Sequence, residues 1–521
     1  MTKPIADILI VGGGVNGCGI ARDAAGRGLK VILCEKNDLA EGTSSRSTKL
    51  FHGGLRYLEY FEFRLVREAL RERETLLAAM PHIARPMRFV LPFHPSMRFE
   101  GGTPASRLLG RFMPWLRDRR PAFVIRLGLF LYDHMGGRKI LPPTRRLNLR
   151  KDEAGQALNG AFRKGWEYSD AAVDDARLVV LNARDAQRLG ADIRTRSEVV
   201  AARRQANFWE VDILGPKGPE TLRARLVVNA AGPWVAGISA KLSPRSERGV
   251  RLVRGSHIVV PRIFGHDRAY ILQGPDGRIV FAIPYHEDFT LIGTTDIDHK
   301  GSPDQVDCSD EEVRYLCDFV SRCFKKPVLP SDVVWRYAGL RPLLDDGAGD
   351  ARSATRDYSL DLEQNDRAPL LTVLGGKITT YRKLSEAAVD LIAPLFTNCK
   401  AAWTARAPLP GGDFDPRQGD ALAEALTRRH PQLAPATARR LIRAYGTEAG
   451  AIMEMGPGTD LGGGLHEAEL RWMVEREFAT TLDDVIWRRS KLGLRVAPDE
   501  RREIQACLEQ LILEQTRGHR Q

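Results

Sequence analysis

The first 35 residues carry apolar runs and glycines in an order that predicts one folded unit. An apolar run at 8–11 leads into the glycine-rich stretch 12–17, and apolar positions at helical spacing follow at 18–27. A second apolar run at 31–34 ends at Glu35. Short apolar runs bounded by turns are typical of buried strands, so the pattern predicts a strand, a turn, a helix and a second strand.

The hydrophobic pattern changes further along the chain. Residues 61–79 place apolar side chains on one helical face, which predicts an amphipathic helix whose many Arg and Glu residues face solvent. From about 160 to 380, strand-like runs alternate with turns. The clearest of these runs are 226–229, 257–260, 279–283 and 291–293.

The last part of the chain shows helical spacing throughout. The stretch 409–413, Leu-Pro-Gly-Gly-Asp, interrupts every pattern and predicts a boundary near 400–416. We therefore divide the chain into residues 1–400, an α/β part, and residues 401–521, an all-helical part. A length of 521 residues agrees with two or three domains. Helices are expected at 420–429, 436–445, 466–477, 481–490 and 499–516.

The net charge indicates the kind of binding partner, and the cysteine content indicates the cellular compartment. The net charge of +12 favours an anionic partner, such as a phosphate substrate, an anionic lipid or a nucleic acid. The seven cysteines include no C-x-x-C pair, so we expect buried thiols in a reducing compartment and no metal site. No apolar run approaches the ~20 residues that a bilayer span needs.

The glycine-rich turn carries the clearest chemical signal. Gly12, Gly14 and Gly17 form the pattern G-x-G-x-x-G between a strand and a helix. The first glycine permits the tight turn, the second lets a pyrophosphate approach the backbone, and the third lets helix and strand pack closely. Glu35 lies 18 residues later, where its carboxylate can bind ribose hydroxyls. The sequence therefore predicts a dinucleotide-binding unit.

Two segments downstream favour FAD over NAD as the dinucleotide. Residues 42–50 and 52–58 are rich in small hydroxyl residues and glycines, which can surround a pyrophosphate and a flavin ring. The glycine turn also lies at the start of the chain, so some 480 residues remain to enclose a large cofactor.

Several longer motifs together carry a family resemblance. They are SSRSTKLFHGGLRYLE after residue 43, VDDARLV (173–179), NAAGPWV (229–235), RGSHIVVP (254–261), IGTTD (292–296), GLRPL (339–343), TRDYSL (355–360) and GGKITTYRKL (375–384). In this order they resemble the FAD-dependent glycerol-3-phosphate dehydrogenases, above all the respiratory, membrane-associated bacterial form. The resemblance covers essentially the whole chain; the stretches 97–120 and 449–463 match least well.

The resemblance implies a fold and a cofactor site. The fold is the α/β (α+β) FAD-binding Rossmann-like domain of the D-amino-acid-oxidase-like superfamily, with an inserted β-rich substrate domain and an all-α C-terminal domain. The implied reaction is oxidation of sn-glycerol 3-phosphate to dihydroxyacetone phosphate, with electrons passing through FAD to a membrane quinone. The residues implied to bind FAD are Gly12, Gly14, Gly17, Glu35, Ser44, Ser45, Lys49, Leu50, Ala231, Gly232, Gly376, Lys377, Ile378, Thr379 and Thr380.

The substrate site combines a cation cluster with a proton acceptor. A phosphate dianion needs several fixed donors, and arginine supplies two at once. Oxidising a secondary alcohol also needs a group that takes the hydroxyl proton, and His257 has a side chain suited to proton transfer near neutrality. His52 is the weaker alternative, and covalent attachment of FAD stays open. The expected catalytic residues are His257 and Arg341, and the expected substrate ligands are Arg56, Tyr57, His257, Arg341, Arg356 and Lys377.

A quinone substrate requires contact with a bilayer. Residues 107–120 carry a net charge of +4 with Leu108, Phe112 and Trp115 among the apolar side chains between the arginines. Pro114 argues against one continuous helix, so we expect two short pieces or a loop. We expect a peripheral, monotopic protein on the cytoplasmic face of the cell membrane, held by basic and apolar residues together. A homodimer is left open by the sequence.

Three other functions stay open at this stage. The same scaffold could reduce oxygen, as a glycerol-phosphate oxidase does. A flavin-dependent RNA-modifying protein would explain the basic charge, but aromatic residues make up only 7% of the chain and nucleic acid is therefore not expected. A non-catalytic membrane-surface protein that keeps FAD for stability is disfavoured by the presence of Arg341, Lys377 and His257.

Overall fold

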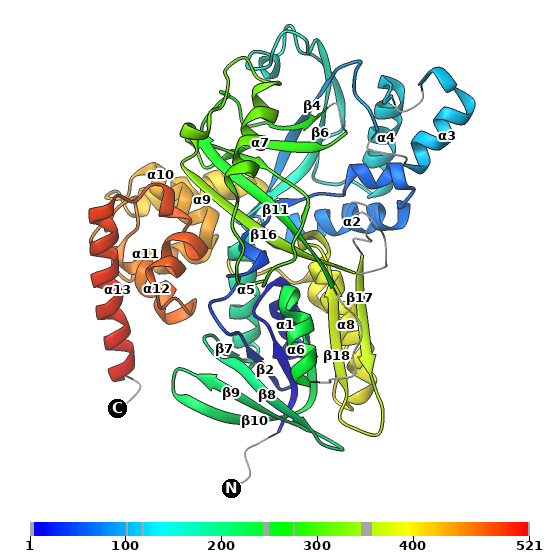
Figure 1. The fold of residues 1–521 in the computed structure, drawn as a ribbon. Helices are drawn as coiled ribbons and strands as arrows, with labels where there is room; N and C mark the ends of the chain where they lie inside the picture. Colours follow the sequence, from blue (N-terminus) through cyan, green and yellow to red (C-terminus); the bar gives the residue numbers. More distant parts are fainter. Residues whose placement is uncertain are drawn as a thin grey trace.

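The computed structural model describes residues 5–99, 103–116, 119–242, 250–274, 277–344 and 357–518. Two β-sheets lie one above the other, and a group of helices formed by the end of the chain packs beside them (Figure 1). The chain starts in the first sheet, passes several times between the two sheets and ends in the helical group.

The first sheet contains the predicted nucleotide-binding unit. Its strands follow the order β17-β18-β10-β1-β2-β7, with β1, β2, β7, β10 and β18 parallel to their neighbours on this path and β17 antiparallel at the edge. Strands β8 and β9 extend it through β10. The bounds are β1 Ala6–Val11, β2 Val31–Cys34, β7 Asp192–Arg194, β8 Glu198–Arg204, β9 Trp209–Gly215, β10 Gly218–Asn229, β17 Tyr358–Glu363 and β18 Leu370–Gly375.

Both faces of this sheet are buried, which explains the unbroken apolar runs in the sequence. Ile8 and Ile10 of β1 face a cluster formed with α1 (Val15–Gly26), α5 (Asp175–Arg188) and α8 (Tyr381–Ile392). Leu9 and Val11 face the opposite cluster, formed with β9 and α6 (Val235–Leu242). A parallel strand covered on both sides needs apolar residues at every position.

The second sheet forms the inserted β-rich part. Its order is β15-β11-β14-β13-β12-β4-β6-β3, with β16 paired to β11 and β5 paired to β6. It carries α7 (Asp310–Ser321) and α2 (Phe63–Ala79), the latter being the predicted amphipathic helix. The strand bounds are β3 Leu50–Phe51, β4 Ala84–Phe93, β5 Arg145–Asn148, β6 Lys164–Val173, β11 Val250–Pro261, β12 Ala269–Gln273, β13 Ile279–Tyr285, β14 Phe289–Gly293, β15 Ile297–Asp298 and β16 Trp335–Leu344.

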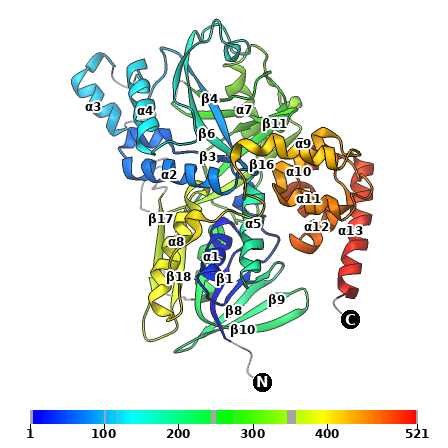
Figure 2. The same ribbon diagram turned by 180° about the vertical axis from the view of Figure 1, so that it is seen from behind.

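Helices α3 (Pro104–Phe112) and α4 (Ala122–Met135) project together at the end of the molecule opposite the C-terminal helices (Figures 1 and 2). As expected, α3 stops before Pro114, and a short turn at Pro114–Leu116 follows. Among the described residues, no helix combines the length and apolarity needed to cross a bilayer.

The C-terminal helices have a hydrophobic core of their own, formed by residues between Ala423 and Leu511. The bounds are α9 Gly419–Arg429, α10 Pro435–Tyr445, α11 Glu448–Glu454, α12 Glu467–Arg476 and α13 Pro498–Gly518. The stretch expected to be a helix at 481–490 is helical, and its part Asp484–Arg489 is a π-helix. The core of these helices supports the predicted change from α/β to all-helical structure.

Candidate functional site

A cavity of about 810 Å³ opens between the two sheets. The carboxyl ends of β1, β2, β10 and β18 reach it from the first sheet, and β11 and β16 reach it from the second. Ligands bind at the carboxyl ends of parallel strands in open α/β sheets, so the cavity lies where the glycine turn predicts a cofactor. Its volume falls in the range of cofactor sites.

The three glycines of the turn are needed for different physical reasons. Gly12 has φ +114°, and a Cβ there would lie 2.6 Å from the Ala230 carbonyl oxygen. A Cβ on Gly17 would lie 1.9 Å from the Gly12 carbonyl oxygen, so Gly17 serves helix–strand packing and does not line the cavity. Gly14 lines the cavity, and a Cβ there would come only within 3.2 Å of the Ser44 Oγ.

Glu35 marks one end of the cavity. Its carboxylate accepts hydrogen bonds from the backbone N–H of Gly13 (2.6 Å) and of Asn37 (2.9 Å), which fixes it beside the glycine turn. Burial raises the pKa of Glu35 above its ordinary value. The carboxylate therefore sits where a ribose hydroxyl beside the pyrophosphate would need an acceptor.

The segment after β2 wraps around the middle of the cavity. Ser44 and Leu50 line it, and the Ser44 Oγ accepts a hydrogen bond from the Val15 N–H (3.0 Å). Ser45 and Lys49 are not among the lining residues. The Lys49 ammonium instead donates to the Ser45 carbonyl oxygen (2.9 Å) and to the buried Asp175 carboxylate (2.9 Å).

The opposite wall comes from residues expected to bind the cofactor in two later motifs. Ala231, Gly232, Gly376, Lys377 and Ile378 all line the cavity. Thr379 and Thr380 are buried behind it, and the Thr379 hydroxyl accepts a hydrogen bond from the His52 N–H at 3.3 Å. His52, the alternative catalytic histidine, also lines the cavity.

His257 lies on β11 and faces the cavity, 2% exposed. Its Nε2 is 3.0 Å from the Thr48 Oγ1, and its ring stacks on Tyr337 with centroids 4.9 Å apart. Its Nδ1 has no hydrogen-bond partner within the described ranges. Burial, followed by the charges of Arg341 and Lys49, lowers the pKa of His257 well below its ordinary value. The imidazole is therefore neutral near pH 7, with a lone pair that can accept a proton, although the same burial makes it a weaker base than an exposed histidine.

Arg341 enters the cavity from β16. Its guanidinium forms an ion pair with Asp296 and donates to the Thr294 Oγ1 at 3.1 Å. A Cβ on Gly255 would lie 2.7 Å from the same guanidinium, so a side chain there would require the guanidinium to shift. Asp296 lies in the IGTTD motif, between β14 and β15, and its pairing with Arg341, 45 residues further along the chain, was not predicted.

The other expected substrate ligands gather on the same cavity. The Lys377 ammonium lies 3.9 Å from the centroid of the Tyr57 ring, a cation–π contact, and Arg56 lines the wall beside them. Arg356 lies outside the described residues. Sequence reasoning missed Asp170, a cavity residue whose carboxylate accepts from Tyr132 (2.7 Å) and pairs with the buried Arg73.

Comparison with known proteins decides the family. A sequence model of the family "FAD dependent oxidoreductase" matches residues 7–382. The chain belongs to this family. Residues 402–514 match a second model, described as the C-terminal domain of alpha-glycerophosphate oxidase. The family establishes FAD as the cofactor and the chain as an oxidoreductase.

Relatives resemble the chain over nearly its whole length. A glycerol-3-phosphate dehydrogenase of Pseudomonas aeruginosa is 48% identical over 95% of this chain and 93% of its own. A D-erythritol 1-phosphate dehydrogenase of Brucella abortus is 47% identical, covering 96% and 97%. The aerobic glycerol-3-phosphate dehydrogenase of Escherichia coli is 43% identical, covering 96% and 97%.

A solved structure shares the fold. The glycerol-3-phosphate dehydrogenase from Bacillus halodurans, complexed with FAD, superposes with a TM-score of 0.71 over 98% of this chain and 95% of its own. Its sequence is 24% identical, so this likeness supports the fold alone.

The cavity fits FAD on its own evidence. Because Gly14 has no Cβ, a pyrophosphate can approach the backbone beside the N-terminus of α1. The first turn of this helix contains no acidic side chain that would repel the phosphates. Glu35 lies on one side of this point, and His257 and Lys377 line the same cavity. The cavity-lining residues that would hold FAD are thus Gly12, Gly14, Glu35, Ser44, Leu50, Ala231, Gly232, Gly376, Lys377 and Ile378.

Proposed function

We propose that this protein oxidises sn-glycerol 3-phosphate to dihydroxyacetone phosphate and passes the electrons to a membrane quinone. The observation that carries the proposal is the meeting of His257, Arg341 and Lys377 on the cavity that begins at the glycine turn. The names of the relatives from Pseudomonas aeruginosa and Escherichia coli support the same substrate.

The cavity residues have different roles in the proposed reaction. Arg341, Lys377 and Arg56 supply positive charge for the phosphate, and the Arg341 guanidinium is held in direction by Asp296 and Thr294. His257, neutral near pH 7, takes the proton of the C2 hydroxyl on its imidazole nitrogen. Bound FAD supplies the hydride acceptor. The apolar wall of Ile271, Ile279 and Phe281 limits water around the reacting carbon.

We expect replacement of the phosphate ligands to weaken turnover, and at Arg341, which is not among the expected FAD ligands, to do so without loss of FAD. Each charge-assisted contact contributes about 1.5–3 kcal/mol, so Arg341→Ala or Lys377→Ala should lower kcat/KM for glycerol 3-phosphate about ten- to a hundredfold. Arg341→Lys, which keeps the charge and loses the forked contact, should lie between the parent and Arg341→Ala. Steady-state rates with a soluble dye as acceptor measure this.

Unphosphorylated glycerol is the control for this assignment. It lacks the group that these cations bind, so it should be a very poor substrate for the parent protein and equally poor for both alanine variants. Comparable turnover of glycerol and glycerol 3-phosphate by the parent would show that the cations do not bind phosphate.

The relative from Brucella abortus makes a second polyol phosphate a specific competitor. Its name is D-erythritol 1-phosphate dehydrogenase, and its identity to this chain is nearly equal to that of the first relative. Both substrates present a phosphate and a secondary alcohol, and they differ in carbon-chain length. Comparing kcat/KM for the two compounds decides between them; we expect glycerol 3-phosphate to be preferred.

The electron acceptor is tested by comparing the rate of turnover with a quinone analogue and the rate with oxygen. We expect turnover with the quinone analogue to be faster.

We infer that the protein docks on a bilayer through α3, α4 and the turn between them. Trp115 and Phe112 are 73% and 71% exposed, and exposed Arg107, Arg111 and Arg119 lie close to them in sequence. Helix α4 adds exposed Phe123, Leu127 and Phe130 at the same end of the molecule (Figure 2). Apolar side chains next to basic ones are typical of surfaces that lie in the headgroup layer of an anionic membrane.

Arg120 does not belong to this surface, contrary to the expectation from the sequence. It is buried, pairs with Glu59, and donates to the Gln273 side chain at 2.9 Å. Its neighbour Arg117 lies outside the described residues.

We expect the double variant Phe112→Ser/Trp115→Ser to bind anionic phospholipid vesicles at least tenfold more weakly than the parent. Each aromatic side chain moved out of water contributes roughly 1.5–3 kcal/mol. Quinone reduction should fall with vesicle binding, while reduction of a soluble dye should stay unchanged. The matched control is Leu214→Ser/Leu513→Ser, which removes two exposed apolar side chains elsewhere. Parent-like sedimentation of the Phe112/Trp115 variant with vesicles would rule out this surface as the anchor.

We also propose that residues 1–400 and 401–521 are separate domains. The first family model ends at residue 382 and the second starts at residue 402, and the C-terminal helices carry their own hydrophobic cluster.

A further inference from the structure

Every residue that lines the cavity lies between positions 11 and 378, so the C-terminal helices add none to it within the described ranges. We define residues 38–49 as the cofactor-wrapping segment. Buried cations of the C-terminal part bind this segment, either directly or through Asp175 of α5. This segment runs from Asp38, which follows β2, through Ser44 and Ser47 to Lys49, which precedes β3. Burial of a charge has a large desolvation free energy unless the charge is paired, so the partners of these cations matter for the stability of the segment.

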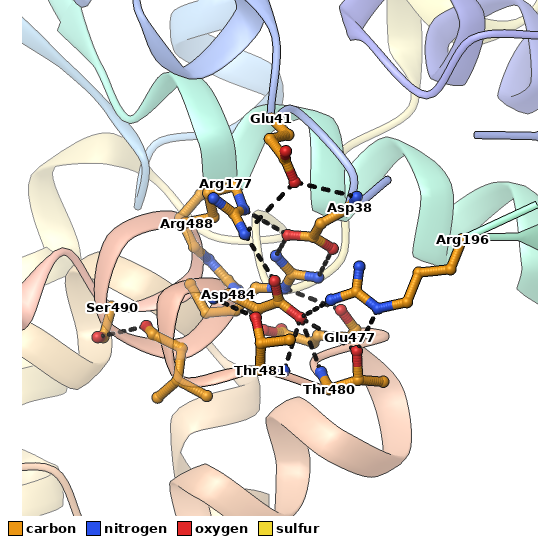
Figure 3. Close-up of polar contacts among 12 residues, drawn as sticks. Asp38, Glu41, Arg177, Arg196, Glu477, Thr480, Thr481, Asp484, Arg488 and Ser490 are labelled. Carbon is orange, nitrogen blue, oxygen red and sulfur yellow. Dashed lines mark hydrogen bonds and ion pairs between the residues drawn. The ribbon is translucent and has the colours of Figure 1, made fainter. Parts of the chain in front are cut away.

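The C-terminal helices hold the start of the segment through Asp38. The Arg489 guanidinium donates to both carboxylate oxygens of Asp38 at 2.7 and 2.8 Å, and both side chains are fully buried. Arg488, the preceding residue on the π-helix, donates to the same carboxylate at 2.5 Å and to Asp484 at 2.6 Å. Figure 3 shows Arg488 and Asp484 grouped beside Asp38.

The π-helix that carries these arginines is itself connected to α5 through Glu477. The Arg489 Nε donates to the Glu477 carbonyl oxygen at 2.8 Å, and the Glu477 carboxylate accepts from Arg177 of α5 at 2.5 Å. Arg177 and Glu477 are both fully buried. The buried Arg177–Glu477 pair therefore holds the arginines in place against Asp38.

The end of the segment is held through a second buried cluster. The Lys491 ammonium donates to the Asp175 carboxylate at 2.9 Å, and the same carboxylate accepts from the Lys49 ammonium at 2.9 Å and from the Ser47 hydroxyl at 2.8 Å. Asp175 is fully buried at the start of α5, and Lys491 is almost so. Asp175 thus joins a C-terminal lysine to two residues of the segment.

Thr48 lies between the two residues that Asp175 holds, and its hydroxyl contacts the Nε2 of His257. Lys49 adopts a left-handed backbone conformation, φ +60°, which non-glycine residues take only when their surroundings enforce it. Asp174 and Asp175 raise the pKa of Lys491 above its usual range although burial opposes its charge. The cation therefore stays charged, and the attraction to Asp175 stays in force, across the working pH range.

We propose that Lys491 and Arg489 are positioning residues that complete the FAD site from outside it, by clamping both ends of the cofactor-wrapping segment. The C-terminal helices then control how tightly FAD is held, although none of their described residues lines the cavity. This proposal concerns retention of the cofactor and does not depend on which polyol phosphate is oxidised.

The test is the rate at which the intact holoenzyme releases FAD, followed as the rise in flavin fluorescence after dilution. Lys491→Met should release FAD at least tenfold faster than the parent, because Asp175 loses one of its two cations and the segment loses its support. Lys491→Arg, which keeps a charged donor, should release FAD within threefold of the parent rate. Where Lys491→Met does not yield folded protein, Lys491→Gln keeps a neutral donor and gives the same comparison.

The matched control is Glu448→Gln. Glu448 of α11 pairs with Arg184 of α5 at 2.8 Å across the same interface, but neither residue touches the cofactor-wrapping segment. This variant should lose thermal stability and still release FAD within threefold of the parent rate. Parent-like release from Lys491→Met, or release from Glu448→Gln as fast as from Lys491→Met, would overturn the clamp. Failure of the proposed reaction is seen separately, as absence of parent flavin reduction by glycerol 3-phosphate.

Discussion

Gly14→Val should yield a folded protein that contains almost no FAD. A Cβ at this position meets only the Ser44 Oγ, at 3.2 Å, and the backbone φ is −82°, so the fold accepts a side chain there. The valine methyl groups, however, would occupy the place where the pyrophosphate approaches the N-terminus of α1. The flavin absorbance per protein of the purified variant measures the loss.

Gly160→Val is the control, because nothing lies within 4 Å of a Cβ at that position. It should keep the parent flavin content. A folded Gly14→Val variant that keeps its yellow colour at full occupancy would place the pyrophosphate elsewhere.

His257→Gln should slow anaerobic flavin reduction at least a hundredfold with FAD content unchanged. A general base contributes about 10²–10⁴-fold to such a step, and glutamine keeps a polar contact to Thr48 but cannot take the proton. The low pKa of His257 keeps the parent side chain neutral at pH 7, so the parent rate should fall only as the pH drops toward that low pKa. The variant should not show this decrease in rate at low pH.

Stopped-flow measurements of flavin reduction, from alkaline pH down to the lowest pH at which the protein stays folded, check both expectations. His266→Gln is the matched control, since His266 is also buried, in the connection between β11 and β12, and its Nε2 lies 2.8 Å from the Tyr270 hydroxyl. It does not line the cavity. Reduction of the His257 variant at the parent rate would assign the proton to another group.

The parts of the fold set by local chemistry were predictable from the sequence. The glycine turn, the two flanking strands and Glu35 lie within 35 residues, and each has its own steric or polar signature. Pro114 likewise ends α3 through its own missing N–H, without help from distant residues.

The parts set by contacts between distant residues were not predictable. Lys49 lies in a motif that resembles a cofactor contact, yet its ammonium is directed at Asp175, a residue 126 positions away. Arg120 was expected on a basic surface and is buried against Glu59. A helix was expected at 481–490, but its π-type winding and the binding of Asp38 by both of its arginines were not predicted. Ion pairs of this kind leave no periodic signal in a single sequence.

The most direct test of the central claim is the visible spectrum of the purified protein under anaerobic conditions. We expect the absorbance of bound oxidised flavin before any addition, and its rapid bleaching when sn-glycerol 3-phosphate is added. Glycerol at the same concentration should leave the spectrum unchanged. A fully FAD-loaded protein whose spectrum does not change with sn-glycerol 3-phosphate would contradict the proposed reaction.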